Sequence, residues 1–179
     1  MGVMPDDMMP SGHDALTQAL TSAWSGRYEV LRKIGSSGMA SVYLATDVHR
    51  RRQVAIKVLH PEVANIVGKE RFLLEIEIAA SLRHPNILPI YEPGMAAELP
   101  YYVMPSVAPG PRRDKLRRER QLPIDQAVGI AINIAEALAV AHDRGIVHRD
   151  VKPANVLLAD SGPLLMDFGI ARVVTDVDR

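Results

Sequence analysis

The stretch that decides the fold reads HRDVKPANVLLADSGPLLMDFG and covers residues 148–169. Four polar residues stand in it among mostly apolar ones: Asp150, Lys152, Asn155 and Asp167. Ionisable groups beside a buried-strand pattern are costly unless they bind something. Asp150 is suited to act as a general base toward a hydroxyl, and Lys152 to stabilise a phosphoryl group. Asn155 and Asp167 offer the oxygen ligands that Mg²⁺ prefers.

Each of these residues also has a purely structural interpretation. His148 could be a satisfied core histidine, Asp150 a turn residue and Asn155 a cap. Their joint spacing within one short segment makes the structural interpretations improbable together.

Composition bounds the class of protein. The 179 residues are 47% hydrophobic, which indicates a globular core in one large or two small domains. Because 21 Lys and Arg balance 21 Asp and Glu, the charge indicates no nucleic-acid partner. The absence of cysteine excludes disulfides and thiol catalysis and indicates a cytoplasmic setting. The longest apolar stretch, 128–141, is interrupted by Glu136 and predicts no membrane segment.

The hydrophobic patterns predict an α+β chain with a strand-rich first half and a helix-led second half. The expected strands are 28–34, 41–48, 53–59, 87–91, 99–104, 155–159 and 163–168. The expected helices are 69–83, a charged segment at 112–120 and a long segment at 125–144, with a short one at 14–24 as a further option. We expect a flexible leader at 1–26, a first part at 27–104, a linker at 105–111 and a second part at 112–179.

Lys57 lies in the run VAIK, on the strand face that also carries Ala55 and Leu59. A strand lysine usually lies at an edge and extends to water; the sharper interpretation is that Lys57 reaches a phosphate. Glu75 is the only acid on the apolar stripe of helix 69–83, so we expect it to pair with Lys57. The alternative is a surface helix with ordinary charges.

The first turn reads IGSSGMASVY, residues 34–43. A glycine-rich loop between two strands lets backbone N–H groups approach phosphates closely. A flexible hairpin turn is an equally open interpretation of this segment alone.

The runs GSSGMASV, VAIK, HRDVKPAN and DFG stand in this order, and together they resemble the signature of bacterial, eukaryotic-like serine/threonine protein kinases. The resemblance covers about residues 27–173. It implies a protein-kinase-like fold with a complete β-rich N-terminal lobe and the first part of a helical C-terminal lobe, shortened within the activation segment. It also implies ATP and Mg²⁺ as cofactors and phosphoryl transfer to Ser or Thr hydroxyls of a protein whose identity stays unspecified.

The resemblance assigns roles to four residues in the chemistry. It implies that Asp150 is the catalytic base and that Lys152 is the cation for the γ-phosphate. It implies that Lys57 holds the α- and β-phosphates and pairs with Glu75.

The resemblance also implies the ligand contacts. Asn155 and Asp167 are the Mg²⁺ ligands by resemblance. The implied contacts to ATP are Ile34, Gly35, Ser36, Ser37, Gly38, Val42, Ala55, Lys57, Met104 and Val107.

Some positions depart from the family pattern. Ser37 and Ala40 replace the second and third glycines of the loop, and Ala108, Pro109 and Arg112 follow the expected hinge. Few residues follow the DFG run, so we expect much of the helical lobe to be absent. Because helix 125–144 is apolar nearly all round, we expect an exposed face and self-association through it. The alternative function is a non-catalytic nucleotide-binding or interaction module.

Overall fold

The structure is a computed structural model that describes residues 12–107 and 121–168. Five strands form one antiparallel sheet in the order β1-β2-β3-β5-β4. They are β1 Tyr28–Ser36, β2 Ala40–Asp47, β3 Arg52–Leu59, β4 Glu92–Ala96 and β5 Leu99–Pro105. The predicted α+β class is confirmed.

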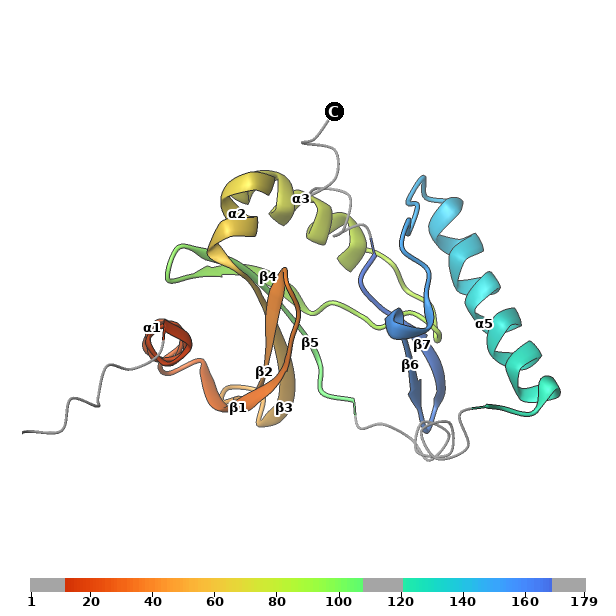
Figure 1. Cartoon of the computed structure of the whole chain (residues 1–179), viewed down its shortest axis with the longest axis horizontal. Helices are drawn as coiled ribbons and strands as arrows, with labels where there is room; N and C mark the ends of the chain where they lie inside the picture. Colours follow the sequence, from red (N-terminus) through yellow and green to blue (C-terminus); the bar gives the residue numbers. More distant parts are fainter. Residues whose placement is uncertain (1–11, 108–120, 169–179) are drawn as a thin grey trace, which may run out of the picture.

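Helices and a second, two-stranded sheet surround this one (Figure 1). The helices are α1 Gly12–Ala23, α2 Pro61–Val67, α3 Lys69–Ala80 and α5 Ile124–His142, and a 3₁₀ turn, η1, covers Pro153–Asn155. The antiparallel hairpin β6 Val156–Ala159 and β7 Gly162–Leu165 stands between the five-stranded sheet and α5, and α1 lies on the opposite side of that sheet.

Alternation along β3 separates the two faces of the five-stranded sheet. Val54, Ile56 and Val58 are at most 1% exposed and share the face that α1 covers, since Ile56 is in register with Tyr43, whose hydroxyl meets Thr17 of α1. Lys57 points to the other face, where it lies in register with Val42 on β2 and Tyr102 on β5. The strand period therefore places Lys57 on the inner face.

The predicted strand at 87–91 is wrong. This segment forms one parallel bridge, between Ile87 and Leu165 of β7, and Leu88 N–H donates to the Leu165 carbonyl at 2.9 Å. Pro89 has no N–H to give to a sheet, which favours a connection over a strand. The fourth strand, β4, follows at Glu92–Ala96 as an edge strand, where its own Pro93 is tolerated.

Close packing explains one glycine of β4. A Cβ on Gly94 would lie 2.5 Å from the Tyr101 ring, so β4 can approach β5 only without a side chain there. The register pairs Gly94 with Tyr101, which fixes this edge of the sheet.

The short helix expected as an option at 14–24 is confirmed as α1, and this described part of the expected leader is packed on the sheet. Leu20 and Trp24 are at most 2% exposed, and Leu16 packs beside them on the outer face of the sheet. The Trp24 ring meets the rings of Tyr43 and Tyr101 edge to face, with centroids 6.2 and 5.3 Å apart. Leu16, Leu20 and Trp24 recur every four residues, and this helical stripe packs α1 on the sheet.

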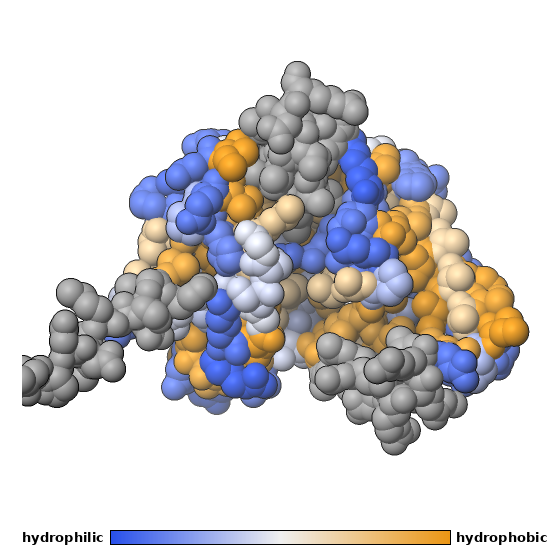
Figure 2. Space-filling view, viewed as in Figure 1, coloured by the Kyte–Doolittle hydropathy of each residue, from blue (hydrophilic) through white to orange (hydrophobic). Residues whose placement is uncertain are grey.

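The helix α5 confirms the long predicted helix and packs on the hairpin through Ile134, Ala137 and Ala141. Much of the rest of α5 is exposed, including Ile124, Val128 and Ile132 (Figure 2). In the part of the chain that the structure describes, α5 is also the one helix long and apolar enough to cross a membrane. This is a weak indication, because a core helix of a globular protein passes the same test.

The remaining elements and segments fall into three groups: confirmed, not predicted, and outside the described residues. The three strands of the first half, the strand at 99–104, the helix at 69–83 and the final hairpin are confirmed with shifted ends. The helix α2 was not predicted, because a seven-residue helix is too short to show a period. The charged segment 112–120 and positions Ala108, Pro109 and Arg112 lie outside the described residues.

Candidate active site

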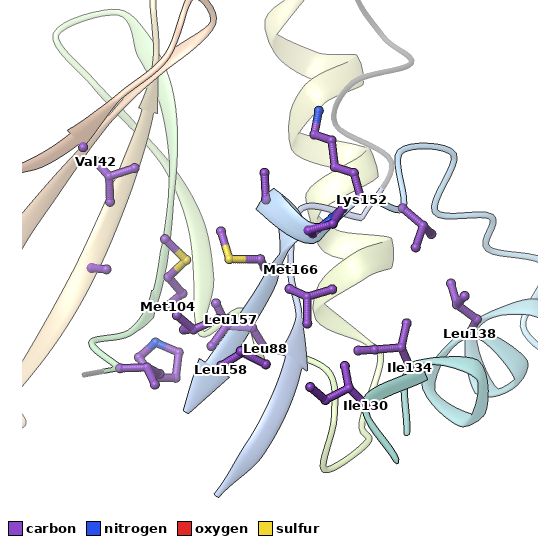
Figure 3. Close-up of a pocket in the computed structure, with 18 of the residues that line it drawn as sticks. Val42, Leu88, Met104, Ile130, Ile134, Leu138, Lys152, Leu157, Leu158 and Met166 are labelled. Carbon is purple, nitrogen blue, oxygen red and sulfur yellow. The ribbon is translucent and has the colours of Figure 1, made fainter. Parts of the chain in front are cut away.

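A cavity of about 1120 Å³ lies between the inner face of the five-stranded sheet, the hairpin and α5 (Figure 3). Six of the residues expected to contact ATP line it: Ile34, Gly35, Val42, Ala55, Met104 and Val107. The hairpin contributes Leu157 and Leu158 and α5 contributes Ile130, Ile134 and Leu138. Lys152 borders the cavity as well, and its amine extends away from the apolar lining. The cavity thus combines a broad apolar interior with a cationic rim.

The glycine-rich turn between β1 and β2 is closed by a serine. The Ser37 hydroxyl accepts from the N–H groups of Met39 and Ala40 at 3.3 and 3.2 Å, and Ser37 N–H donates to the Ala40 carbonyl at 2.9 Å. Gly38 has open space around it. The serine at the second glycine position therefore uses these backbone donors inside the turn, and Ser36, Ser37 and Gly38 do not line the cavity.

Lys57 and Asp167 meet beside the cavity and do not line it; their neighbours Val42, which pairs in register with Lys57, and Met166 do. Lys57 Nζ lies 2.7 Å from Asp167 Oδ1, and the two side chains are 16% and 19% exposed. The Tyr102 hydroxyl donates to the same oxygen at 2.8 Å. Asp167 holds a backbone φ of 65°, a left-handed conformation that costs free energy for a residue other than glycine. Tertiary contacts therefore hold this carboxylate in place.

Among the described residues the Lys57 ammonium is paired with Asp167, in place of the expected ion pair with Glu75. Glu75 lies half-buried on α3 and has an interaction of its own. The structure thus brings Lys57 to the predicted metal ligand.

Asp150 and Lys152 lie next to each other on the loop before the hairpin. Lys152 Nζ is 2.7 Å from Asp150 Oδ2, and the Asn155 amide donates to the same oxygen at 3.0 Å and to the Asp150 carbonyl at 2.8 Å. The Lys152 ammonium, together with the Asn155 amide, holds the pKa of the Asp150 carboxyl below its usual range. Asp150 is therefore a carboxylate at neutral pH and can accept a proton.

His148 anchors this loop. Its ring is 1% exposed, Nε2 lies 2.9 Å from the Met166 carbonyl, and Nδ1 accepts from Asp150 N–H at 3.3 Å. These partners require the proton on Nε2. The ring also packs against Phe168 with centroids 4.7 Å apart. These contacts match the interpretation of His148 as a core histidine. They connect the Asp150 loop to the segment around Asp167.

Asn155 and Asp167 carry side-chain oxygens and belong to two segments that a backbone hydrogen bond joins. Met166 N–H donates to the Asn155 carbonyl at 3.0 Å, which joins the end of η1 to the residue before Asp167. Because the Asn155 amide nitrogen is used on Asp150, its side-chain oxygen remains an acceptor for another partner. No cluster of three His, Cys, Asp or Glu suited to a metal occurs within residues 12–107 and 121–168. Two protein oxygens completed by phosphate oxygens fit the habits of Mg²⁺.

Comparison with known proteins decides the family. The model of the protein kinase domain matches residues 28–178. The chain belongs to the protein kinase family. The predicted protein-kinase-like fold is thereby confirmed, with the five-stranded sheet as its N-terminal lobe.

Similar proteins include bacterial kinases. Serine/threonine-protein kinase PknB of Mycobacterium leprae is 40% identical over 158 residues, which are 85% of this chain and 25% of PknB. Serine/threonine-protein kinase PrkC of Bacillus subtilis is 42% identical over 155 residues, 84% of this chain and 24% of PrkC. The crystal structure of the Mycobacterium tuberculosis PknI kinase domain superposes with a TM-score of 0.69 at 35% identity, covering 81% of this chain and 59% of that one. The chain thus spans about a quarter of these curated relatives.

Several residues of this kinase-family site were not predicted. Tyr102 was missed although its strand register places it opposite Lys57. Leu157, Ile130 and Leu138 were missed because periodicity shows that a residue is apolar, and not which cavity it faces.

Proposed function

We propose that this chain binds Mg²⁺·ATP in the cavity and transfers the γ-phosphoryl group to Ser or Thr hydroxyls of a protein. The observation that carries the proposal is the ion pair of Lys57 and Asp167 beside an apolar cavity lined by Val42, Ala55 and Met104, with Lys57 in register with Val42. An adenine ring suits the apolar lining, and the phosphates suit the Lys57 end. The similar kinases are named as serine/threonine kinases, which supports the substrate class.

The chemistry assigned to the residues is positioning and charge neutralisation. Lys57 holds the α- and β-phosphates after it leaves Asp167. Asp150 accepts the hydrogen bond of the substrate hydroxyl and takes its proton as the bond from that oxygen to the γ-phosphorus forms. The bond from the γ-phosphorus to the bridging oxygen breaks, and ADP leaves. Lys152 stabilises the charge on the phosphoryl group during the transfer.

Asn155 and Asp167 would hold the Mg²⁺ ion, as their oxygen donors allow. The ion would neutralise charge on the β- and γ-phosphates. Since ATP is an intracellular nucleotide, we place the chain in the cytoplasm.

The second candidate is a non-catalytic nucleotide-binding module. It is favoured by the exposure of Ile124, Val128 and Ile132 on α5, which are 83%, 51% and 53% exposed in the described structure. These exposed apolar side chains leave one face of α5 unpacked. The same exposure supports self-association of the chain through this face of α5.

A transfer assay separates the two candidates. Labelled ATP, Mg²⁺ and a generic substrate such as myelin basic protein are incubated with the chain and with its Asp150→Asn variant. Because α5 is so exposed, we expect slow labelling by the chain, and labelling at least about 100-fold slower with Asp150→Asn, since the proton acceptor is lost.

Nucleotide binding is measured on the same two proteins. Binding of Mg²⁺·ATP to both, with label from the parent chain alone, supports the kinase. Binding by both with no label from either supports the non-catalytic module. Equal labelling by both proteins contradicts the role of Asp150.

A further inference from the structure

Tyr102 is a buried phenol in direct contact with the proposed metal ligand. Its hydroxyl donates to Asp167 Oδ1 at 2.8 Å, and its side chain is 2% exposed. Lys57 Nζ donates to the same oxygen at 2.7 Å and lies 5.8 Å from the centre of the Tyr102 ring. One carboxylate oxygen therefore has two donors, and the three side chains form one unit.

The two donors differ in their freedom to move. Lys57 reaches Asp167 at the end of a flexible four-carbon chain. The Tyr102 ring is fixed on β5, in register with Lys57, and lies 6.5 Å from the Phe72 ring of α3. If Lys57 turns to a phosphate, the Tyr102 hydroxyl is the donor that stays.

The buried Tyr102 hydroxyl also requires a hydrogen-bond acceptor. The Tyr102 side chain is 2% exposed, so its O–H is a buried hydrogen-bond donor. Among the described residues its hydrogen-bond partner is Asp167. A buried donor that loses its partner is unfavourable, so the hydroxyl resists any rotation of Asp167 away from it.

We propose that Tyr102 is a positioning residue that holds Asp167 Oδ1 and thereby presents Oδ2 to Mg²⁺ when ATP is bound. The inference rests on the proposed function and adds to it a residue on β5. Asp167 needs such a restraint because its φ of 65° is not a conformation that the chain favours by itself. Removing the hydroxyl leaves Asp167 free to adopt orientations that do not face the metal.

The test is the Mg²⁺ dependence of ATP-induced stabilisation in the Tyr102→Phe variant, which keeps the ring and removes the hydroxyl. The melting temperature is recorded at saturating ATP, from chelated metal to millimolar Mg²⁺, and the midpoint in Mg²⁺ is compared with that of the parent chain. We expect the Mg²⁺ midpoint to be about tenfold higher than in the parent chain, as for a lost hydrogen bond to a charged group. The change in melting temperature that ATP causes without metal should equal that of the parent chain. A residue that only packs would lower all melting temperatures and leave the midpoint in place.

Tyr101→Phe is the matched control. Tyr101 is the next residue on β5, is 4% exposed, and points to the opposite face beside Trp24. We expect this variant to keep the parent midpoint.

The outcomes separate the inference from the proposed function. If the parent chain gains no stability from Mg²⁺·ATP, the proposed function fails and the inference fails with it. If the parent is stabilised and Tyr102→Phe has the parent midpoint, the inference alone is wrong. A Tyr102→Phe chain that does not fold would also overturn it, because the hydroxyl would then serve the fold and not the metal.

Discussion

At the scale of single residues, the polar positions of the sequence are better determined than their partners. A ligand site could be predicted from one run of the sequence, because polar residues at that spacing among apolar ones need a ligand. The run holds Asp150, Lys152, Asn155 and Asp167. The partner of Lys57 could not be predicted, because an ammonium on a flexible side chain can reach carboxylates from two elements. Tyr102 was hidden because a tyrosine in a strand is ordinary until its register is known.

Replacing Lys57 tests the ion pair beside the cavity. In Lys57→Met the half-buried Asp167 carboxylate loses its cation, so the free energy of unfolding should fall by about 2 kcal/mol. The variant should also lose the stabilisation that Mg²⁺·ATP gives the parent chain. Urea denaturation with and without Mg²⁺·ATP measures both effects.

The control for this change is Lys33→Met on the exposed side of β1. It should change neither quantity measurably. A Lys57→Met chain that still gains full stability from Mg²⁺·ATP would contradict the phosphate role.

Asp47 gives a pH dependence. Burial raises the pKa of this carboxyl, but the Arg50 backbone N–H and guanidinium outweigh burial and hold the pKa below its usual range. Since the pKa is lowered on folding, the carboxylate stabilises the fold above the unfolded value near 4, and this stability is lost as pH falls through the folded pKa.

Asp47→Asn should therefore lower the free energy of unfolding by about 1–2 kcal/mol at pH 7, and the difference should shrink below pH 4. Urea titrations at several pH values measure it. Glu77→Gln, an exposed change on α3, should show no such trend. A difference that stays constant with pH would be inconsistent with a charged role for Asp47.

At the scale of elements, alternation and turn residues predicted the first three strands, β5 and the final hairpin. The hairpin was clear because Asp160, Ser161 and Gly162 separate two apolar runs. The segment 87–91 was misassigned because an apolar run looks the same whether it joins a sheet or bridges to β7. The optional helix at 14–24 is confirmed as α1, but the Met, Pro, Ser and Gly content of the leader gave no sign that Leu16, Leu20 and Trp24 pack on the sheet.

Trp24 tests whether α1 is part of the domain. Because its ring is 2% exposed and packs between Tyr43 and Tyr101, Trp24→Ala should cost about 3–5 kcal/mol of unfolding free energy. Chemical denaturation measures the loss. Gln18→Ala, on the exposed side of α1, should change stability by less than about 0.5 kcal/mol. Equal, small effects for both variants would mean that α1 is a dispensable leader after all.

At the scale of the whole molecule, the sequence predicted an exposed apolar face on the long helix, and the exposure of α5 bears this out. What covers the face depends on association in solution, which no periodicity encodes. If self-association occurs through this face, light scattering at tens of micromolar should give a mass above the 19.6 kDa of one chain.

Ile132→Glu should restore the monomer mass, because a buried carboxylate would oppose the contact. Ile66→Glu on α2 is the control, since Ile66 is 52% exposed and Ile132 is 53% exposed. A monomer mass for the unaltered chain would contradict the association.

The central claim is that the cavity beside Lys57 and Asp167 binds Mg²⁺·ATP, and the melting temperature of the chain tests it most directly. A ligand at a hundredfold excess over its Kd adds about 2.7 kcal/mol to stability, which for a chain of this size is a rise of about 5–10 °C. We predict a rise of this size at millimolar Mg²⁺·ATP. An unchanged melting temperature at that concentration would contradict the claim.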